Sequence, residues 1–401
     1  MVTMNKRWII FRLLPTATGV LLLSMLLTVA YSKRASGQTA LPEPAQGPAQ
    51  GTEQEDSVYL YGFFKDVSDP SGCGELANRV SSLALRPTVL LSIERGPEFL
   101  LDLPGGDELM ACAVKAFQDS GHAVKALFLQ DTVYLTNTAE ALRRAAKLNE
   151  FIVRHPGSFA GAQADIEPYV TEDWSCGDVH DRRNIFATLR DLLGQVREQM
   201  PGVPLGVAVG WWTPATADDY PEAAPESLLK VADELYLMVY GDEGGPVVAG
   251  SAARILSRIN SPEYFSARGR VIVAMGTYEY RSPQDLQTEL EKVNRALAFR
   301  PHFAGTSVFH AQSVFDAPLV RLVSGQVTDQ SGRFVPGVEI ESDGMRDTSN
   351  RCGKFGLRGT SLLQGELTLR KAGYKTLKMP FQVRRLGVEK ELGQVVLQKE
   401  N

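Results

Sequence analysis

The sequence contains few residues that could hold a metal ion or form a redox centre. Of its 401 residues only 5 are histidines and 4 are cysteines, and no two cysteines have the CxxC spacing of zinc or redox motifs. The first strand-like segment is not followed by the GxGxxG turn that binds a dinucleotide. We therefore expect no metal site and no cofactor.

The sequence also lacks a surplus of basic residues. Its formal net charge is −5, although residues 1–32 contain three basic residues and no acid, so the remainder is more acidic still. A nucleic-acid partner needs a basic surface to neutralise its phosphates, and this composition argues against one. With 44% hydrophobic and 22% charged residues, the composition is that of a globular protein with room for two or three domains.

The chain begins with a long apolar run from Leu13 to Tyr31, preceded by Lys6 and Arg7. This order is typical of an export signal, and the run is also close to the length that spans a bilayer. Residues 1–32 are interpreted as a cleaved signal peptide or as a membrane anchor, the only expected contact with a membrane. Residues 33–56, rich in Ala, Gly, Pro, Gln and Glu, predict a flexible linker. The rest is expected outside the cytoplasm: secreted, periplasmic or held at the outer side of the inner membrane.

Four cysteines follow this segment: Cys73, Cys112, Cys176 and Cys352. An even number of cysteines in an exported protein permits disulfides, although the sequence alone does not give their pairing. Cys73 and Cys112 both lie in segments expected to be early helices or their loops, so our prediction pairs these two. The alternative is that the cysteines are inert thiols that form no bridge.

Between residues 57 and 320, apolar strand-like runs alternate with amphipathic helix patterns. Asn137 and Ser282 are typical helix N-caps, the second followed by Pro283 at the first helical position. Eight strands alternating with helices over this length predict a (β/α)₈ barrel, with a doubly wound open sheet as the alternative. The eight runs are Val58–Phe64, Thr88–Ile93, Val124–Leu129, Phe159–Glu167, Leu205–Gly210, Glu234–Tyr240, Val271–Met275 and Gly305–Phe309.

From residue 322 to 401 the pattern changes to short alternating strands separated by glycine turns. The order of these turns, from Gly325 through Pro336-Gly337 and Gly353 to Gly373, resembles the carboxypeptidase regulatory-like, prealbumin-type β-sandwich. The resemblance implies an accessory or spacer domain without catalytic residues. Fold class is therefore expected to be α/β, a barrel followed by an all-β sandwich.

The stretch from Phe159 to Tyr169 carries the residues with the clearest chemistry. In a strand, residues two apart point to the same face, so Asp165 and Glu167 project together, and Pro168 ends the strand. Because active sites of such barrels form at the carboxyl ends of the strands, both acids belong to the expected site. Other residues at strand ends, expected to bind substrate, are Gln130, Trp211, Trp212, Met238, Asp242, Tyr278, Tyr280 and His310.

Acids together with aromatic rings are typical of sugar sites, where carboxylates cleave the glycosidic bond and rings stack on pyranoses. The stretch Phe159–Glu167 resembles the fourth-strand signature of family 18 glycoside hydrolases, the chitinase-like barrels. That signature reads apolar-D-G-apolar-D-apolar-D-x-E, and here Ala160 and Gln163 replace its first two acids. Met238-Val239-Tyr240 resembles the family's M-x-Y, with Gly241 in place of the following Asp.

The resemblance implies a retaining mechanism assisted by the N-acetyl group of the substrate. In it Glu167 protonates the glycosidic oxygen, Asp165 orients the acetamido group, and Tyr240 forms a hydrogen bond to that group. The expected activity is that of a glycosidase acting on a polysaccharide that contains N-acetylhexosamine. The missing acids, Gly241 and the absent eighth-strand Trp favour the rival hypothesis, an envelope barrel that binds glycan or protein without cleaving it.

Each candidate residue also has a purely structural explanation. Asp165 and Glu167 could form a rim pair neutralised by Arg95 or Lys65, and Tyr240 could be an ordinary core residue. Of Trp211 and Trp212 only one can face the centre, because they are adjacent in a strand. His310 is more often structural than catalytic when it stands alone, and Glu94 and Asp131 are expected to be solvated or salt-bridged.

Overall fold

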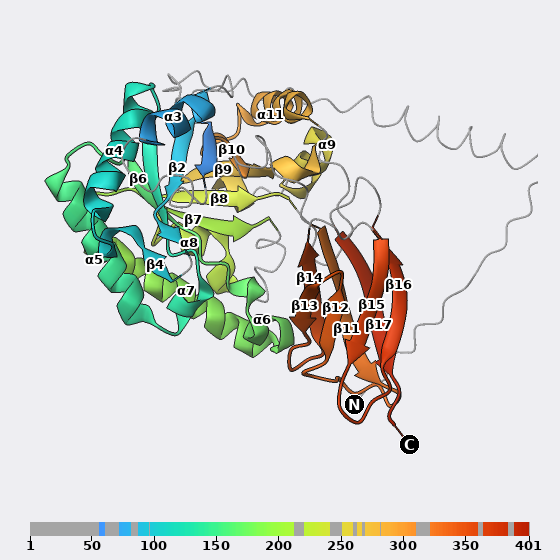
Figure 1. The fold of residues 1–401 in the computed structure, drawn as a ribbon. Coiled ribbons are helices and arrows are strands. Elements are labelled where there is room, and N and C mark those ends of the chain that lie inside the picture. The colour runs from blue at the N-terminus through green and yellow to red at the C-terminus, as the bar shows by residue number, and fades with distance from the viewer. Residues whose placement is uncertain are drawn as a thin grey trace, which may run out of the picture. The chain divides into compact units, whose positions relative to one another are not determined.

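The computed structural model describes twelve stretches of the chain (Figure 1): 56–60, 72–81, 87–95, 97–211, 220–240, 251–259, 263–266, 269–280, 282–309, 321–359, 364–383 and 389–400. The signal or anchor (1–32) and nearly all of the linker (33–56) lie outside these residues. In the stretches described, no helix has the length and apolarity needed to cross a membrane.

Eight parallel strands form a closed barrel, as the sequence predicts. Their order around the barrel is β1-β10-β9-β8-β7-β6-β5-β2, and every neighbouring pair is parallel. The open-sheet alternative is therefore wrong. The strands are β1 (Ser57–Leu60), β2 (Thr88–Ser92), β5 (Val124–Phe128), β6 (Gly161–Ala164), β7 (Leu205–Gly210), β8 (Glu234–Met238), β9 (Arg270–Gly276) and β10 (Phe303–Phe309). A short hairpin, β3 (Glu94–Arg95) with β4 (Glu98–Phe99), follows β2.

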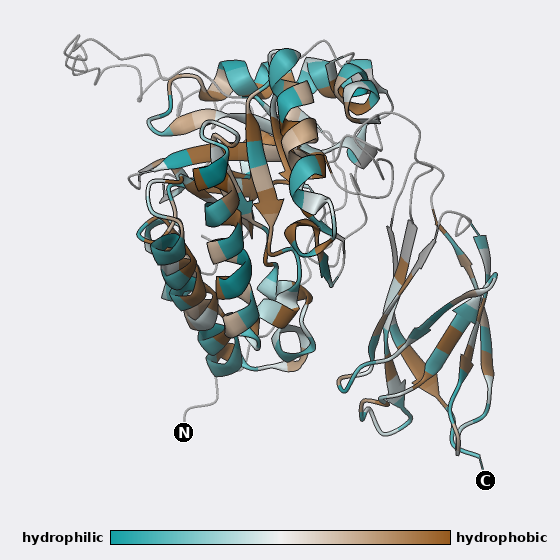
Figure 2. Cartoon of the chain, turned by 60° about the vertical axis from the view of Figure 1, so that its left-hand side comes forward, coloured by the Kyte–Doolittle hydropathy of each residue, from teal (hydrophilic) through white to brown (hydrophobic). Residues whose placement is uncertain are grey.

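Helices connect the strands, and their starts follow the capping signals in the sequence. The Asn137 side chain accepts a hydrogen bond from the Glu140 amide (3.3 Å), and Ser282 Oγ accepts one from the Asp285 amide (3.1 Å). Figure 2 shows hydrophobic residues along the barrel strands, and helices in which hydrophilic and hydrophobic residues alternate. The helices are α3 (Cys73–Ser81), α4 (Gly106–Asp119), α5 (Thr138–Arg154), α6 (Glu172–Cys176), α7 (Val179–Gln199), α8 (Pro225–Leu228), α9 (Ala252–Arg258), α10 (Glu263–Ser266) and α11 (Pro283–Leu297).

Short 3₁₀ turns complete the connections: η2 (Leu100–Asp102), η3 (Thr132–Leu135), η4 (Pro168–Val170), η6 (Pro221–Ala223) and η7 (Thr277–Glu279).

Alternation along the strands divides their side chains between two cores. One set packs outward against the helices, and the other fills the barrel interior. Gly206 makes room for one of the large interior rings, because a Cβ there would lie 2.8 Å from the Tyr236 ring. The interior set comprises Tyr59, Leu90, Leu127, Ala208, Tyr236, Met238, Ile272, Ala274 and Ala304.

A buried ion pair lies at the amino ends of β5 and β8, inside the barrel. Lys125 Nζ is 2.8 Å from Glu234 Oε2, and both side chains are at most 5% exposed. Lys125 also donates to the Tyr236 hydroxyl at 3.2 Å. Because this is the end of the barrel opposite the carboxyl ends of the strands, we assign the pair to stability and not to chemistry.

The C-terminal strands form two sheets around one apolar core, which confirms the expected all-β domain. The sheet orders are β14-β11-β17 and β13-β12-β15-β16. The core draws on both sheets, for example Val323 and Leu357 from the first and Ile340 and Leu369 from the second, so the two sheets form a sandwich. The strands are β11 (Arg321–Asp329), β12 (Glu339–Ser342), β13 (Met345–Thr348), β14 (Lys354–Gly359), β15 (Gln364–Arg370), β16 (Leu377–Gln382) and β17 (Glu389–Leu397).

A disulfide joins Cys176 of α6 to Cys352, which lies between β13 and β14. No sequence pattern indicates this pair, because its two members are separated by 176 positions and belong to different domains. Barrel and sandwich lie within one compact unit, residues 53–401. Cys73 and Cys112 lie in α3 and α4, which contact each other, and their pairing stays a prediction.

Candidate functional site

Asp165 and Glu167 follow β6 at its carboxyl end. Strand β6 is shorter than the expected Phe159–Glu167, because its ladder ends at Ala164 and η4 begins at Pro168. Backbone pairing continues for one more position, where the Asp165 amide donates to the Phe128 carbonyl (3.2 Å). Ala162, Ala164 and Ile166 pack outward, so the alternating positions 163, 165 and 167 face the interior.

Asp165 lies in a buried environment beside Tyr59 of β1. Asp165 is only 9% exposed, and Tyr59 is 1% exposed. The Gln163 side-chain amide donates to the Tyr59 hydroxyl (2.5 Å). Burial raises the pKa of Tyr59 well above its usual value, and the nearby charge of Asp165 raises it further. Tyr59 is therefore a neutral phenol at physiological pH.

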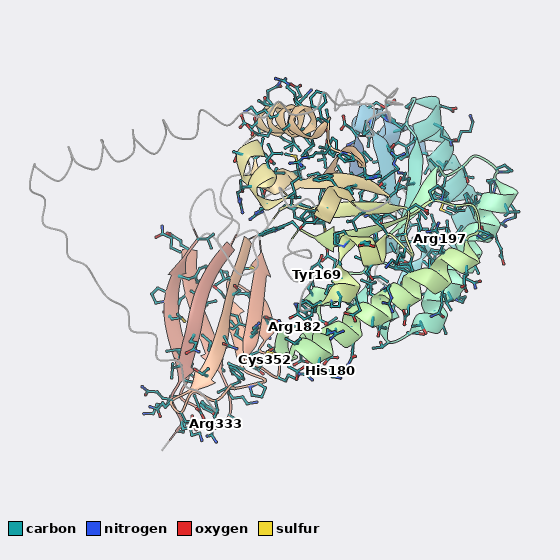
Figure 3. The ribbon with its side chains drawn as sticks, turned by 180° about the vertical axis from the view of Figure 1, so that it is seen from behind. Tyr169, His180, Arg182, Arg197, Arg333 and Cys352 are labelled. Carbon is teal, nitrogen blue, oxygen red and sulfur yellow. A yellow bond between two sulfur atoms is a disulfide. The ribbon has the colours of Figure 1, made fainter. Side chains whose placement is uncertain are left out.

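Tyr169, which is labelled in Figure 3, follows Glu167 by two residues and forms a hydrogen bond to it. Burial raises the pKa of Tyr169 strongly, and the charges of Glu167 and Asp165 and a hydrogen bond to Glu167 act in the same direction. The hydroxyl also lies 3.9 Å from Met238 Sδ. Because the phenol keeps its proton, it is the donor in the bond to the Glu167 carboxylate.

Met238 and Tyr240 belong to the same interior. Met238 is 5% exposed and belongs to the interior set, and Tyr240 packs against that set. The Tyr240 ring stacks on Phe309 of β10, with centroids 4.8 Å apart and an interplanar angle of 17°. Phe309 in turn contacts Tyr59 edge to face at 5.7 Å. The structure thus gathers the acid pair, Met238 and Tyr240 in one interior, with an aromatic group around them.

Sequence reasoning missed Tyr59, Tyr169 and Phe309 as members of this site. Tyr169 could have been found only as a near neighbour of Glu167 in sequence, because it lies in η4 and not in the strand. Phe309 and Tyr59 are the interior-facing positions of their strands, a signal that appears once the inward register is known. No local pattern links Tyr59 to Gln163, which lie 104 positions apart.

Trp211 and Tyr280 lie elsewhere. Both pack against the core between the barrel and its helices, not against the interior. The Arg258 guanidinium lies over the Trp211 ring at 4.5 Å, and the same Arg258 donates to the Val239 carbonyl. Burial, followed by the charge of Glu279, raises the pKa of Tyr280. These contacts favour the packing explanation for Trp211.

Gln130 follows β5 and is held by neighbouring polar groups. Ser92 Oγ donates to Gln130 Oε1 at 2.8 Å, and the backbone amide of Gln130 donates to the Glu94 carboxylate at 2.9 Å. Glu94 also accepts from Arg144 (3.0 Å) and Tyr134 (3.2 Å), so it is a buried salt-bridged residue, as one of the structural explanations expected.

Several candidates lie outside the part of the chain that the structure describes. They are Trp212, Asp242 and His310, together with the side chains of Tyr278 and Arg95 and the whole of Lys65 and Gly241. Within the described stretches, no three His, Cys, Asp or Glu side chains are grouped so that they could hold a metal ion.

No protein-family model and no curated protein sequence matches this chain. Solved structures are similar to it at low identity. An exo-β-1,4-mannosidase from Opitutaceae bacterium strain TAV5 is 14% identical over 64% of this chain and 52% of that one, with a TM-score of 0.46. A GH18 chitinase from Pseudoalteromonas aurantia is 16% identical over 64% of this chain and 93% of that one, with a TM-score of 0.42. The β-mannanase of the blue mussel Mytilus edulis is 8% identical over 65% of this chain and 87% of that one, with a TM-score of 0.43. The chain spans about half the length of the mannosidase.

Proposed function

We propose that the protein is an exported glycoside hydrolase that acts on a polysaccharide containing N-acetylhexosamine. The observation that carries the proposal is the placement of Asp165 and Glu167 on one inner face, at the carboxyl end of β6. In a barrel of this class the substrate binds at that end of the strands. The buried Tyr59 and the half-buried Tyr169 lie beside the acids and exclude bulk water from part of their surroundings, which supports acid catalysis there.

In the proposed mechanism Glu167 donates its proton to the glycosidic oxygen as the bond to the leaving sugar breaks. The acetamido oxygen of the substrate attacks the anomeric carbon, and Asp165 orients and stabilises that group. Water then opens the intermediate with Glu167 as general base, which retains the anomeric configuration. Tyr240 faces the same interior and is assigned the hydrogen bond to the acetamido group.

Tyr169 adds a role that follows from its contacts. Its neutral hydroxyl forms a hydrogen bond to Glu167 and so fixes the carboxyl orientation before and after proton transfer. It is a positioning residue, because it acts on the substrate through Glu167.

The disulfide supports the proposed export. Disulfides persist in oxidising compartments and are rare in the cytosol, and Cys176–Cys352 joins two domains across a long stretch of chain. Export, by a cleaved signal peptide or with an uncleaved anchor, stays a proposal, since residues 1–32 lie outside those described.

The rival function is a barrel that binds glycan or a protein partner at the envelope without cleaving it. The observation that favours it is the environment of Gln163, where the family signature has an acid. Gln163 is fully buried, and its amide is bonded to Tyr59, so no second acid stands beside Asp165 at this position.

The Glu167→Gln variant separates the two functions. If the wild type releases products from a panel of defined glycans, the variant should lose about a thousandfold or more of that turnover while it still binds them. Glu108→Gln, an exposed glutamate in the first turn of α4, is the matched control and should keep full activity. Binding without turnover by the wild type would establish the rival.

A further inference from the structure

Among the residues that the structure describes, a disulfide and a set of polar contacts join the barrel to the sandwich. Helix α6 meets the connection between β13 and β14 through the disulfide and several polar contacts. Arg351 forms an ion pair with Asp173 (2.9 Å), and its amide donates to the Glu172 carboxylate (2.5 Å). Asn350 Nδ2 donates to Ser175 Oγ, and Lys354 Nζ donates to the Ser175 carbonyl, both at 3.3 Å.

The sandwich side of this contact is a preformed turn. The Asn350 side-chain oxygen accepts from the amides of Cys352 (3.2 Å) and Lys354 (2.9 Å), and the Gly353 amide donates to the Asn350 carbonyl (2.9 Å). Gly353 has φ +75°, and a Cβ there would lie 2.3 Å from the Val327 carbonyl oxygen. The turn is therefore held against β11, so Cys352 is presented by a rigid element.

On the barrel side, a continuous hydrogen-bonded segment connects this contact to the acid pair. The Val170 amide donates to the Glu167 carbonyl (3.2 Å), and the Thr171 amide and hydroxyl both donate to the Pro168 carbonyl (3.2 and 2.7 Å). Thr171 then caps α6, accepting from the Trp174 amide at 3.1 Å. Only nine positions separate Glu167 from Cys176, and two short helical turns, η4 and α6, occupy most of them.

A second attachment holds α6 to the barrel. Trp174 packs edge to face on Phe186 of α7 at 5.1 Å, and the Arg182 guanidinium lies over the Trp174 ring at 5.1 Å. Arg182 Nε also donates to the Trp174 carbonyl (2.9 Å). Both helical turns are too short to be stable alone, so they depend on α7 on one side and on the sandwich on the other.

We propose that the β-sandwich positions the catalytic acid: the Cys352 turn, bonded to α6, holds the segment that carries Glu167 and Tyr169. The sandwich is then part of the working site and not only a spacer. The inference rests on the proposed glycan site for its effect on turnover, whereas its structural content is independent of any substrate.

The test is hydrogen exchange of the full chain, read over the backbone amides of residues 165–176 and over β8 as an internal control. Three samples are compared: the oxidised wild type, the wild type treated with dithiothreitol, and Cys176→Ser/Cys352→Ser. Dithiothreitol transfers two electrons and two protons to the disulfide, giving two thiols and its own cyclic disulfide. Exchange over 165–176 should become about tenfold faster in the second and third samples and stay unchanged in β8.

Treatment of the double variant with dithiothreitol should not accelerate exchange further. That result would assign the effect to this disulfide and not to Cys73 or Cys112. Asn350→Ala, which leaves both cysteines in place, should accelerate the same segment to a smaller extent and serves if the double variant does not fold. Equal exchange over 165–176 in all samples overturns the proposal, and so does acceleration spread evenly through the barrel.

Turnover provides a separate arm. If the wild type cleaves a glycan, breaking the disulfide should lower kcat about tenfold with little change in KM, because the acid moves and the binding residues do not. A change confined to KM contradicts a positioning role. Absence of turnover by the wild type counts against the proposed function alone, and the exchange result still decides the inference.

Discussion

At the scale of single residues, Tyr169 makes a contact that can be tested directly. Replacing it with Phe removes the hydroxyl that bonds Glu167 and lies near Met238 while keeping the ring. A hydrogen bond to a charged group contributes about 1.5–3 kcal/mol, so glycan turnover should fall about tenfold or more. The melting temperature should change by only a few degrees.

The matched control is Tyr374→Phe in the sandwich, where a half-buried tyrosine packs at the edge of a different core. Steady-state kinetics and thermal melts of the two variants give the comparison. Equal activities of Tyr169→Phe and the wild type would show that the contact does not serve catalysis.

The raised pKa values of Tyr59 and Tyr169 also predict how stability depends on pH. Both groups have a usual value of 10.0 and are raised by burial and by the neighbouring acids. A tyrosine whose pKa is raised by folding contributes stability that is complete below pH 10 and is lost as the pH rises towards the folded value. Thermal melts between pH 8 and pH 11 should therefore show falling stability, and the fall should be shallower in Tyr169→Phe. Parallel curves would contradict the assignment.

The sequence predicted that Asp165 and Glu167 lie together because two-residue spacing and the following Pro168 are local signals. It also predicted Met238 and Tyr240 at the end of their strand, and the structure gathers these residues in one interior, while their roles stay predictions. It could not identify Tyr59, since the bond between Tyr59 and Gln163 depends on how β1 and β6 face each other across the barrel. Contacts that cross the interior are set by the closure of the barrel, which no short pattern encodes.

At the scale of elements, the barrel contains a buried ion pair between Lys125 and Glu234. The apolar pattern of Glu234–Tyr240 predicted a strand but not this pair. Strands β5 and β8 are not neighbours in the barrel, yet the side chains of Lys125 (β5) and Glu234 (β8) meet inside it. Replacing one partner leaves a buried charge, although Arg270 lies 3.5 Å from Glu234 and offsets part of the loss. We expect Lys125→Met to lower the free energy of unfolding by about 3 kcal/mol.

Urea unfolding measures this effect, and Lys115→Met is the control, because its ion pair with Asp119 is exposed. That control should lose less than about 0.5 kcal/mol. The double variant Lys125→Met/Glu234→Leu should regain most of the loss, since no unpaired charge remains in the interior. A double variant less stable than Lys125→Met would contradict the explanation.

Elements were easier to predict than their ends. Leu205–Gly210 begins and ends as expected, because a continuous apolar run with small residues at its end has no competing pattern. Strand β6 ends three residues before the expected Glu167, because the residues after Ala164 leave the ladder to form η4. Helix starts were predictable from caps, as at Asn137 and Ser282, since a cap is a local hydrogen bond.

At the scale of the whole molecule, the disulfide changes the interpretation of the two-domain organisation. The alternation of strands and the spacing of glycines indicated a barrel and a sandwich from the sequence, but gave no link between them. Such a link requires side chains on two domains to meet, and neither domain's pattern contains information about the other's surface. Cys176 and Cys352 could have been paired only with the three-dimensional structure.

The same disulfide closes a loop of 176 positions and so should contribute strongly to stability. In the chain-entropy description, a loop of this length restricts the unfolded state by about 5 kcal/mol at 25 °C. Denaturant unfolding of the wild type with and without dithiothreitol should show a difference of up to that size. Because folding of each domain depends on its own core, the reduced chain should still fold, and the sandwich should then unfold separately from the barrel. A single transition at the same midpoint in both conditions would mean that the polar contacts of Asn350 and Arg351 alone hold the domains together.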